Sequence, residues 1–450
     1  ACFFFADTMA GENSAMVLKV FTPTIFFSGI LGVFRGYFQA HGSMLQTSFS
    51  QVLEQIANAL VSIGAAVLFL SFVSQADATT QAVYGAMGSA VGTGMGVVIA
   101  LLFMIIIYRM NSPMFQARRK RDRSGESLTY KQVFTMILTM VTPVILSTCI
   151  YNVSSFTNLQ IYSRISETLR GYTEAQIATA YGYFSGKANP ITNIPIAFAT
   201  AMSIAIIPAI SGSYEKGNKK ETRDKIGQGI KTAMLISIPS AVGMAVLAKP
   251  VVYLLYPQPQ SLEMVSKLLM IMSPSVVFYG LSTVTNGVLQ ATGYVNKPVI
   301  HASVALIVQT IVLAILLIYT PADVSAMSVT AVLYSLCVSL LNGISLRRKL
   351  QYHQEMVKTF MLPVIAAAGM GAAAYGIYWG MEQCFVLFKL KQPDTMSWSL
   401  NCISLMISVF GAAVLYFLLI IKLKAIEKQE LQALPKGTFI VRIAQKLHLL

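Results

Sequence analysis

Charged side chains are scarce in this 450-residue chain: they make up only 11% of it, whereas 55% of its residues are hydrophobic. Acids are the rarest charge, with 18 Asp and Glu against 33 Lys and Arg. With a mean hydropathy of +0.64, the chain has too little polar surface to cover a soluble globule of this length. The scarcity of charge therefore excludes a soluble protein and indicates a membrane protein.

Sequence motifs for covalent chemistry are also missing. The five cysteines show no CxxC spacing, which argues against disulfides and metal clusters. The chain contains no HExxH, no Gly-rich phosphate loop after a strand and no nucleophile motif, so we expect neither an enzyme nor a cofactor. The net charge of +15 would suit nucleic acid, but the cations lie in short loops between apolar runs. The positive-inside rule explains that pattern, and we expect no nucleic-acid partner.

Apolar runs long enough to cross about 30 Å of hydrocarbon recur along the chain. They predict eleven membrane-spanning helices and an apolar stub at residues 1–11. The expected spans are 16–40, 44–74, 82–110, 131–157, 178–212, 226–256, 262–292, 297–320, 325–348, 357–383 and 397–423.

Clusters of Lys and Arg orient these spans, because positive side chains near helix ends resist export. Such clusters fall in the connections 109–131, 214–231 and 347–358, and again after Lys422. Each is separated from the next by an even number of spans, so all lie on one side of the membrane. That side is predicted to be the cytoplasm.

Two apolar stretches in the chain are similar in sequence. PTIFFSGILGVFRGYFQAHG at 23–42 and PSVVFYGLSTVTNGVLQATG at 274–293 share eight of twenty residues without a gap. Unrelated apolar segments would share roughly one or two, so the pair indicates a duplication. Arg35 in the first copy corresponds to Asn286 in the second. The copies lie six spans apart, which predicts parallel repeats related by an axis along the membrane normal.

The repeat organises the chain as an all-α polytopic membrane protein with two parallel, pseudo-symmetric six-helix lobes and two further helices. Only the second lobe has all six spans, so we expect an N-terminally truncated fragment with about eleven of fourteen spans. The expected parts are an incomplete N-terminal lobe (1–110), a basic cytoplasmic loop (111–130), the C-terminal lobe (131–348), two extra helices (357–423) and a basic cytoplasmic tail (424–450).

One helix carries a polar stripe at membrane depth, where each charge costs about 2.5 to 3.5 kcal/mol. Gln51, Glu54, Gln55 and Asn58 follow the i, i+3, i+4, i+7 spacing of one helix face. The stripe must face protein or water, either to hold helices together by hydrogen bonds or to take part in transport. Arg35 nearby has three interpretations: it snorkels to the surface, pairs with Glu54, or contacts substrate.

Lys187 is the stronger candidate for a substrate site. Helix-weakening residues and two amides surround it in the span 178–212: Gly182, Gly186, Asn189, Pro190, Asn193 and Pro195. An interrupted helix with an ammonium at its break is typical of midplane sites in transporters, with Gly186, Pro190 and Pro195 as the hinge. The alternative is a lysine that snorkels to the outer surface. Because cationic drugs need buried carboxylates and phosphates need Lys or Arg, the visible residues favour an anionic substrate.

Three runs together resemble a known family. GVFRGYFQAHGSMLQTSFSQVLEQ at 32–55, NIPIAFATAMSIAIIPAIS at 193–211 and LQATG at 289–293 are similar to the polysaccharide-exporter branch of the multidrug/oligosaccharidyl-lipid/polysaccharide superfamily. Within that branch the similarity is to MurJ-type lipid II flippases and stage V sporulation protein B of low-GC Gram-positive bacteria. It covers essentially the whole chain.

The resemblance implies a flippase in the bacterial cytoplasmic membrane. Two lobes around a cationic cavity would open alternately and move an undecaprenyl-diphosphate-linked glycan, such as the peptidoglycan precursor lipid II, to the outer leaflet. In the family, a cavity cation on the eighth helix precedes a Leu-Pro motif; here that position is Pro190, and Lys187 lies three residues earlier. The last two helices, 357–383 and 397–423, would form the groove for the lipid tail. Coupling to membrane potential or to Na⁺ or H⁺, and partners in wall synthesis or cell division, are left open.

Three other functions stay in view. A cation-coupled multidrug exporter shares the superfamily and would need a buried acidic cluster. A flippase for capsule or teichoic-type lipid-linked oligosaccharides differs only in the headgroup it carries. A membrane scaffold for wall synthesis or sporulation that transports nothing would not need Lys187.

Overall fold

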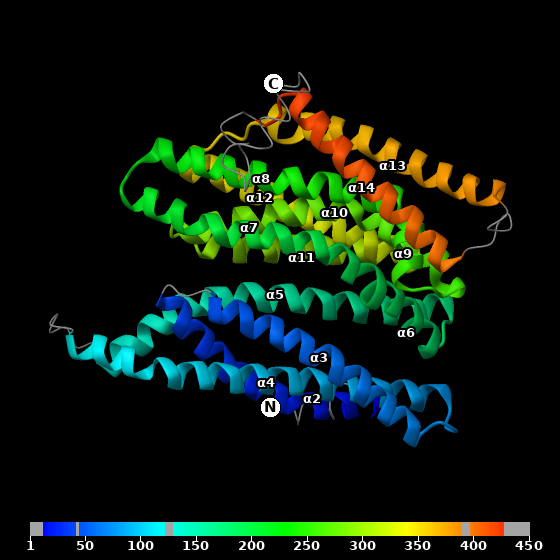
Figure 1. Ribbon diagram of the computed structural model, residues 1–450, viewed down its shortest axis with the longest axis horizontal. Coiled ribbons are helices and arrows are strands. Elements are labelled where there is room, and N and C mark those ends of the chain that lie inside the picture. Colours follow the sequence, from blue (N-terminus) through cyan, green and yellow to red (C-terminus); the bar gives the residue numbers. More distant parts are fainter. Residues whose placement is uncertain (1–11, 42–44, 122–128, 389–396, 427–450) are drawn as a thin grey trace. The chain divides into compact units, whose positions relative to one another are not determined.

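The computed structural model of the chain describes residues 12–41, 45–121, 129–388 and 397–426 (Figure 1). Its regular elements in this part are all helices, which confirms the all-α polytopic fold. Ten helical segments of the described chain are long and apolar enough to cross a membrane. The eleventh expected span, 131–157, lies within a helix some of whose side chains fall outside the described residues.

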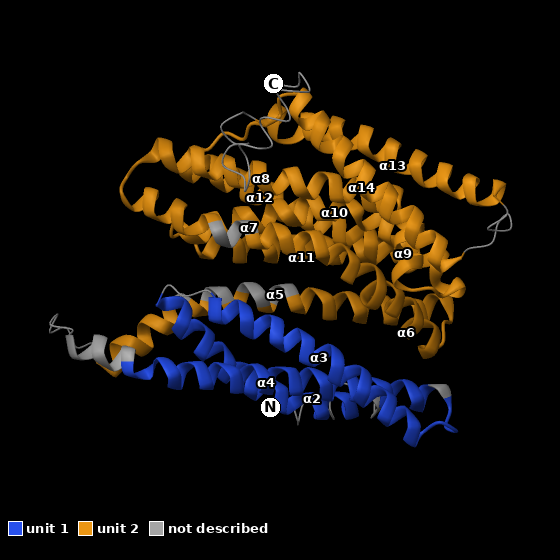
Figure 2. Cartoon of the chain, in the orientation of Figure 1, with its two compact units in different colours: residues 1–128 blue, residues 129–450 orange. Residues whose placement is uncertain are grey.

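The chain divides into two compact units, residues 1–128 and 129–450 (Figure 2). Unit 1 contains α2 (Glu12–Ala40), α3 (Leu45–Phe72) and α4 (Ala78–Arg121). The segment 111–130 was expected to be a loop, but α4 continues through it as far as Arg121. Long runs of Arg and Lys are good helix formers, so the charge that ends the membrane span does not end the helix. The stub at 1–11 lies outside the described residues.

Unit 2 contains the remaining helices, two of which begin with a π-helical turn. They are α5 (Tyr130–Arg170), α6 (Glu174–Gly182), η1 (Tyr183–Ala188), α7 (Asn189–Glu215), α8 (Lys219–Val246), α9 (Ala248–Leu255), α10 (Pro259–Ala291), α11 (Asn296–Tyr319), α12 (Ser325–Leu350), η2 (Val357–Met361), α13 (Leu362–Leu387) and α14 (Trp398–Lys422). The expected tail 424–450 lies outside the described residues after Ile426.

Glycines set the close approach of α3 and α4 in unit 1. Gly88, Gly92 and Gly96 recur every four residues on α4 and face α3. A Cβ atom added to Gly88 would lie 2.6 Å from the backbone of Ala66, so only a hydrogen fits there. Since lipid tails are as apolar as leucine, such small-residue packing, and not apolar burial, holds membrane helices together.

The duplication seen in the sequence also appears in the packing. Helix α4 packs against α2 and α3, and α12 packs in the same way against α10 and α11. The two copies of the repeated stretch lie on α2 and α10, and each has a proline at the equivalent point, Pro23 and Pro274. Helices α2 to α4 are therefore the structural counterparts of α10 to α12.

Helix α8 packs against α7, α10 and α13 in unit 2. Ile230, Met234 and Met370 belong to the buried apolar cluster at these contacts, and α14 joins the unit through α13 and α9. The two extra helices 357–423 are therefore part of the same compact unit as the C-terminal lobe.

The expected span 226–256 is not one helix. It breaks at Leu247, between α8 and α9. Pro250 explains the break, because its ring excludes the carbonyl of the residue four positions earlier and it has no N–H to donate.

Candidate functional site

Lys187 lies in the π-helical turn η1, between α6 and α7. Its Nζ atom donates hydrogen bonds to Oε1 of Gln258 at 2.6 Å and to Oγ of Ser261 at 2.7 Å. The rings of Tyr183 and Tyr256 face the same ammonium, with centroids 5.1 and 5.6 Å away. These contacts hold the cation without a carboxylate among the described residues, so its positive charge is not neutralised.

A missing donor explains why the helix is irregular here. Pro190 has no N–H, so the carbonyl of Gly186 loses its α-helical partner. The hydroxyl of Tyr256 donates to that carbonyl instead, at 3.4 Å. The irregular turn expected from the sequence is therefore present, and π-helical turns often mark functional positions. Movement about Gly186, Pro190 and Pro195 remains a prediction.

Contacts with α10 fix the position of Lys187 along unit 2. Helix α7 runs for 27 residues, about 40 Å, from the turn that holds Lys187 to the basic connection at its far end. On the other side of Lys187 the apolar helical run continues to Glu174. The partners of Lys187, Gln258 and Ser261, lie at the start of α10, directly after α9, and Figure 1 shows α9 at the opposite end of unit 2 from the connection between α7 and α8. The depth of Lys187 in the membrane, at the midplane or near the outer surface, stays a prediction.

The two asparagines predicted to accompany Lys187 do not join it. Asn189 lines a separate cavity of about 60 Å³ inside unit 2, and Asn193 is exposed on α7. Pro195 is buried, whereas Gly186 and Pro190 are exposed. Lys187, Asn189 and Asn193 therefore do not form one site.

The cavity beside Asn189 was missed in the sequence. Its polar wall includes Ser154 on α5, whose hydroxyl donates to Oε1 of Gln309 on α11 at 3.0 Å. Asn158, one turn further along α5, has a buried Oδ1 atom without a hydrogen-bond partner in the described structure. The i, i+4 spacing of Ser154 and Asn158, which puts both on one face of α5, was the available signal.

Arg35 and Glu54 form an ion pair in unit 1, with Nη2 and Oε2 2.6 Å apart. The arginine side chain is 18% exposed and the glutamate side chain 20%. Nε of Arg35 also donates to Oγ of Ser50 at 2.9 Å. Because the carboxylate balances the guanidinium, Arg35 has little net charge to offer an anion, and pairing is the interpretation that the geometry favours.

The polar stripe of α3 is divided between two environments. Glu54 and Asn58 face neighbouring helices, and Oδ1 of Asn58 accepts hydrogen bonds from Ser62 at 2.8 Å and from Thr93 on α4 at 3.3 Å. Gln51 and Gln55 are exposed. Half of the stripe therefore holds helices together, and the role of the other half is a prediction.

Unit 2 has a neutral polar cluster at the equivalent position. Asn286, the counterpart of Arg35, accepts a hydrogen bond from Nδ2 of Asn342 at 2.8 Å. Oδ1 of Asn342 lies 2.7 Å from Nδ1 of His301, and Nε2 of His301 lies 3.0 Å from Oγ of Ser345. At the same offset of 251 positions, His301 is the counterpart of Ser50. Both copies thus place a polar link at this point, ionic in one and neutral in the other.

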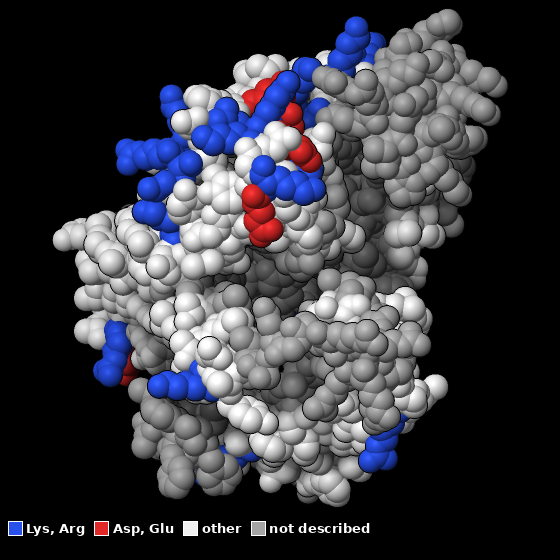
Figure 3. All heavy atoms as spheres, turned by 90° about the vertical axis from the view of Figure 1, so that its left-hand side faces the viewer, with Lys and Arg blue, Asp and Glu red and all other residues white. Residues whose placement is uncertain are grey.

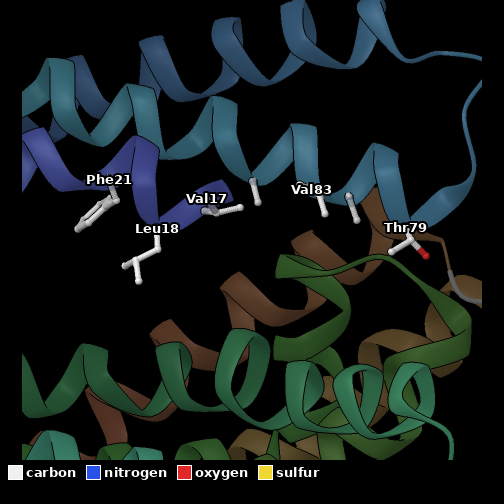
Figure 4. Close-up of a pocket in the computed structure, with 7 residues that line it drawn as sticks. Val17, Leu18, Phe21, Thr79 and Val83 are labelled. Carbon is white, nitrogen blue, oxygen red and sulfur yellow. The ribbon is translucent and has the colours of Figure 1, made fainter. Parts of the chain in front are cut away.

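An apolar pocket of about 490 Å³ lies between α2 and α4 in unit 1 (Figure 4). Val17, Leu18 and Phe21 line it from α2, and Val83 lines it from α4, with Thr79 at one end. These side chains offer no charge, so the pocket has no group that would bind a diphosphate.

The chain is similar in sequence to proteins of one known family. A family model described as "Lipid II flippase MurJ" matches residues 4–393. The chain is 25% identical over 418 residues to the lipid II flippase MurJ of Bacillus subtilis (strain 168), covering 90% of this chain and 72% of the relative. It is 22% identical over 449 residues to stage V sporulation protein B of the same organism, covering 98% and 80%.

Two solved structures show the same fold. Lipid II flippase MurJ in an inward closed conformation aligns with a TM-score of 0.59 and 15% identity, over 89% of this chain and 73% of that one. A MATE transporter in complex with MaL6 aligns with a TM-score of 0.59 and 18% identity, over 78% and 74%. At these identities the structures show the fold alone. The family match, which spans most of the chain, shows that this multi-pass protein of the bacterial cytoplasmic membrane belongs to the MurJ lipid II flippase family.

Proposed function

We propose that the protein is a flippase that moves an undecaprenyl-diphosphate-linked glycan resembling lipid II from the inner to the outer leaflet by alternating access. The family supports a transporter of lipid-linked precursors. To this we add a lipid II-like headgroup, transport from the inner to the outer leaflet, and alternating access.

The observation that carries the proposal is the charge of Lys187. Its hydrogen-bond partners, Gln258 and Ser261, are neutral acceptors, and the tyrosine rings stabilise a cation without cancelling it. A diphosphate could replace either acceptor and form a charge-assisted hydrogen bond, which is about twice as strong as a neutral one. Lys187 would hold the diphosphate while the polyprenyl chain stays in lipid.

Arg35 has a different part in this proposal. Its ion pair with Glu54 leaves it as a link between α2 and α3, so it does not contact the headgroup. The same pairing argues against a cation-coupled multidrug exporter that would use Glu54, because that carboxylate already has a cation. The fold is compatible with either a drug or a lipid-linked glycan as cargo, because a MATE transporter and MurJ align with this chain at the same TM-score of 0.59.

A complementation assay tests the proposal. The full-length protein is expressed in a bacterium depleted of its own lipid II flippase, and lipid II exposed on the outer leaflet is measured. We expect rescue by the wild type and by Lys187→Arg, and a loss of about tenfold or more in exposed lipid II for Lys187→Gln. Lys249→Gln is the matched control, because Lys249 is an exposed lysine on α9, near the same end of unit 2.

The outcomes separate the cargo from the site. Rescue by Lys187→Gln equal to wild type would remove Lys187 from the site but keep lipid II as cargo. No rescue by a well-expressed wild type would contradict lipid II as cargo. The same variants would then be tested with capsule or teichoic-type precursors.

A further inference from the structure

The short helix α9 connects the Lys187 site to α14. Tyr256 and Gln258, which directly follow α9, are two of the four groups around the Lys187 ammonium. The other two, Ser261 and Tyr183, belong to α10 and η1. Half of the groups that surround the cation therefore depend on where α9 ends.

The end of α9 leaves a main-chain acceptor without its usual donor. The last four carbonyl groups of an α-helix have no donor within the helix. For the carbonyl of Leu254 the donor at helical spacing would be the N–H of Gln258, but that N–H donates to the carbonyl of Tyr256 at 2.7 Å. Nε1 of Trp398, the first residue of α14, donates to the Leu254 carbonyl instead, at 3.1 Å. A side chain of α14 thus caps α9.

A second hydrogen bond joins α14 to α9 one turn further along. Asn401 is only 2% exposed, and its Nδ2 donates to the carbonyl of Pro250 at 3.1 Å. Its Oδ1 accepts a hydrogen bond from the hydroxyl of Tyr378 on α13 at 2.7 Å. Because both ends of the amide are bonded, its orientation is determined by its neighbours. At a buried site a lost partner leaves an unsatisfied group, so this bond holds α9 in one position along α14.

Helix α9 is separate from the helices before and after it in the chain. Leu247 interrupts the helix between α8 and α9, with φ −102° and ψ 24°, and Tyr256 ends α9 with φ −134° and ψ 81°. Tyr256 precedes Pro257, whose ring disfavours the helical conformation for the residue before it. Packing against α10 and α14 therefore sets the position of α9, and α14 supplies two side-chain hydrogen bonds to its main chain.

We propose that Trp398 and Asn401 are positioning residues for Lys187. They fix α9, and α9 in turn holds Tyr256 and Gln258 against the ammonium. The importance of this arrangement for transport rests on the proposed function of Lys187, whereas the hold on the ammonium does not. If the two residues only anchored α14 in unit 2, their loss would leave the surroundings of Lys187 unchanged.

Competitive acetylation of lysines, read by mass spectrometry, tests the positioning role on the full-length protein in detergent micelles without cargo. Acetylation consumes the free amine, so its rate at Lys187 rises when groups that hold the ammonium are lost. The double substitution Trp398→Phe/Asn401→Leu should raise that rate by about fivefold, the factor that corresponds to one neutral hydrogen bond. Trp398→Phe alone, at a side chain that is 48% exposed, should raise it by about twofold.

Two controls separate a local effect from a general loss of stability. Trp379→Phe makes the same change on α13, at a side chain that is 58% exposed, and should leave the rate at Lys187 unchanged. Lys225 is an internal reference: it is partly buried, and its Nζ lies 2.6 Å from Glu221 and donates to the carbonyl of Ala209 at 3.1 Å. It belongs to the basic end of unit 2, where Lys and Arg gather over the upper part of Figure 3. General loosening would raise the rates at Lys225 and Lys187 together.

Each outcome of the acetylation experiment bears on the proposal. A rise at Lys187 alone is the expected result. An unchanged rate at Lys187 in the double variant, or equal rises at Lys187 and Lys225, would overturn the positioning role and leave Trp398 and Asn401 as anchors of α14. If the double variant does not fold, Trp398→Phe decides by the same comparison.

The complementation assay then connects the positioning role to transport. Exposed lipid II should fall by about fivefold in the double variant and stay at the wild-type level in Trp379→Phe. Full rescue by a double variant with raised acetylation would overturn the role of Trp398 and Asn401 in transport. Full rescue by Lys187→Gln would instead count against the proposed function of Lys187, and the acetylation result would stand by itself.

Discussion

The ion pair between Arg35 and Glu54 yields a quantitative prediction. Two unit charges about 4 Å apart at an effective dielectric constant of about 20 attract one another by about 4 kcal/mol. The side chains are 18% and 20% exposed, so solvent screening and lost side-chain freedom reduce the net value. We expect a coupling energy of about 2 kcal/mol between the two residues.

A double-mutant cycle measures that coupling. Arg35→Gln and Glu54→Gln should each lower the free energy of unfolding in detergent micelles by about 2 kcal/mol, because each leaves one charge unpaired between helices. The double substitution should cost no more than either single one, since two amides can bond to each other. Leu60→Ala, an exposed site further along α3, is the control for a general change in the helix.

Two results would contradict this account. Strictly additive losses, with a coupling energy within about 0.5 kcal/mol of zero, would mean that the pair does not stabilise unit 1. A second contrary result would be full transport by Glu54→Gln together with no transport by the double variant, although that variant is stable. Arg35 would then contact the cargo, which its ion pair with Glu54 argues against.

Three further predictions follow from local contacts. Gly96→Ala should lower the unfolding free energy by about 1 to 3 kcal/mol, because its Cβ would lie 2.8 Å from the carbonyl oxygen of Glu54. Gly85→Ala, whose Cβ would meet only the side chain of Leu70 at 3.9 Å, should be neutral or stabilising. An equal loss of unfolding free energy in both variants would refute the close packing of α3 and α4. Hydrogen bonds from Thr80 and Thr79 hold the pKa of Asp77 below its ordinary value. The stabilisation that Asp77 gives to the start of α4 is therefore fully present above the ordinary pKa and is lost as pH falls through the lower pKa of the folded state. Amide hydrogen exchange of the first turn of α4 should accelerate in that pH range, and Asp77→Asn should abolish this pH dependence. Asp323→Asn should lower the unfolding free energy of unit 2 by about 1 to 2 kcal/mol, because Oδ1 of Asp323 lies 3.3 Å from Nη1 of Arg170 and accepts a hydrogen bond from the hydroxyl of Tyr162 at 3.0 Å. An unchanged midpoint of denaturant unfolding would show that neither contact stabilises the unit.

Part of the candidate site could be predicted from sequence because its causes are local. Pro190 removes a donor from its own helix, so the irregular turn at Lys187 follows from a few neighbouring residues. The polar stripe of α3 likewise follows from helical spacing. The partners of these residues could not be predicted, because Gln258 lies 71 positions from Lys187 and Asn342 lies 56 positions from Asn286. The depth of Lys187, at the midplane or near the outer surface, stays a prediction.

The sequence by itself determined the membrane class, most of the spans and the duplication, because hydrocarbon thickness acts on each segment separately. The cytoplasmic side of the basic clusters stays a prediction. The tertiary structure decided which polar groups meet. It pairs Arg35 with Glu54 and places Lys187 among neutral acceptors. Burial and pairing fix the effective charge of each group, and both depend on helices that are far apart in the chain.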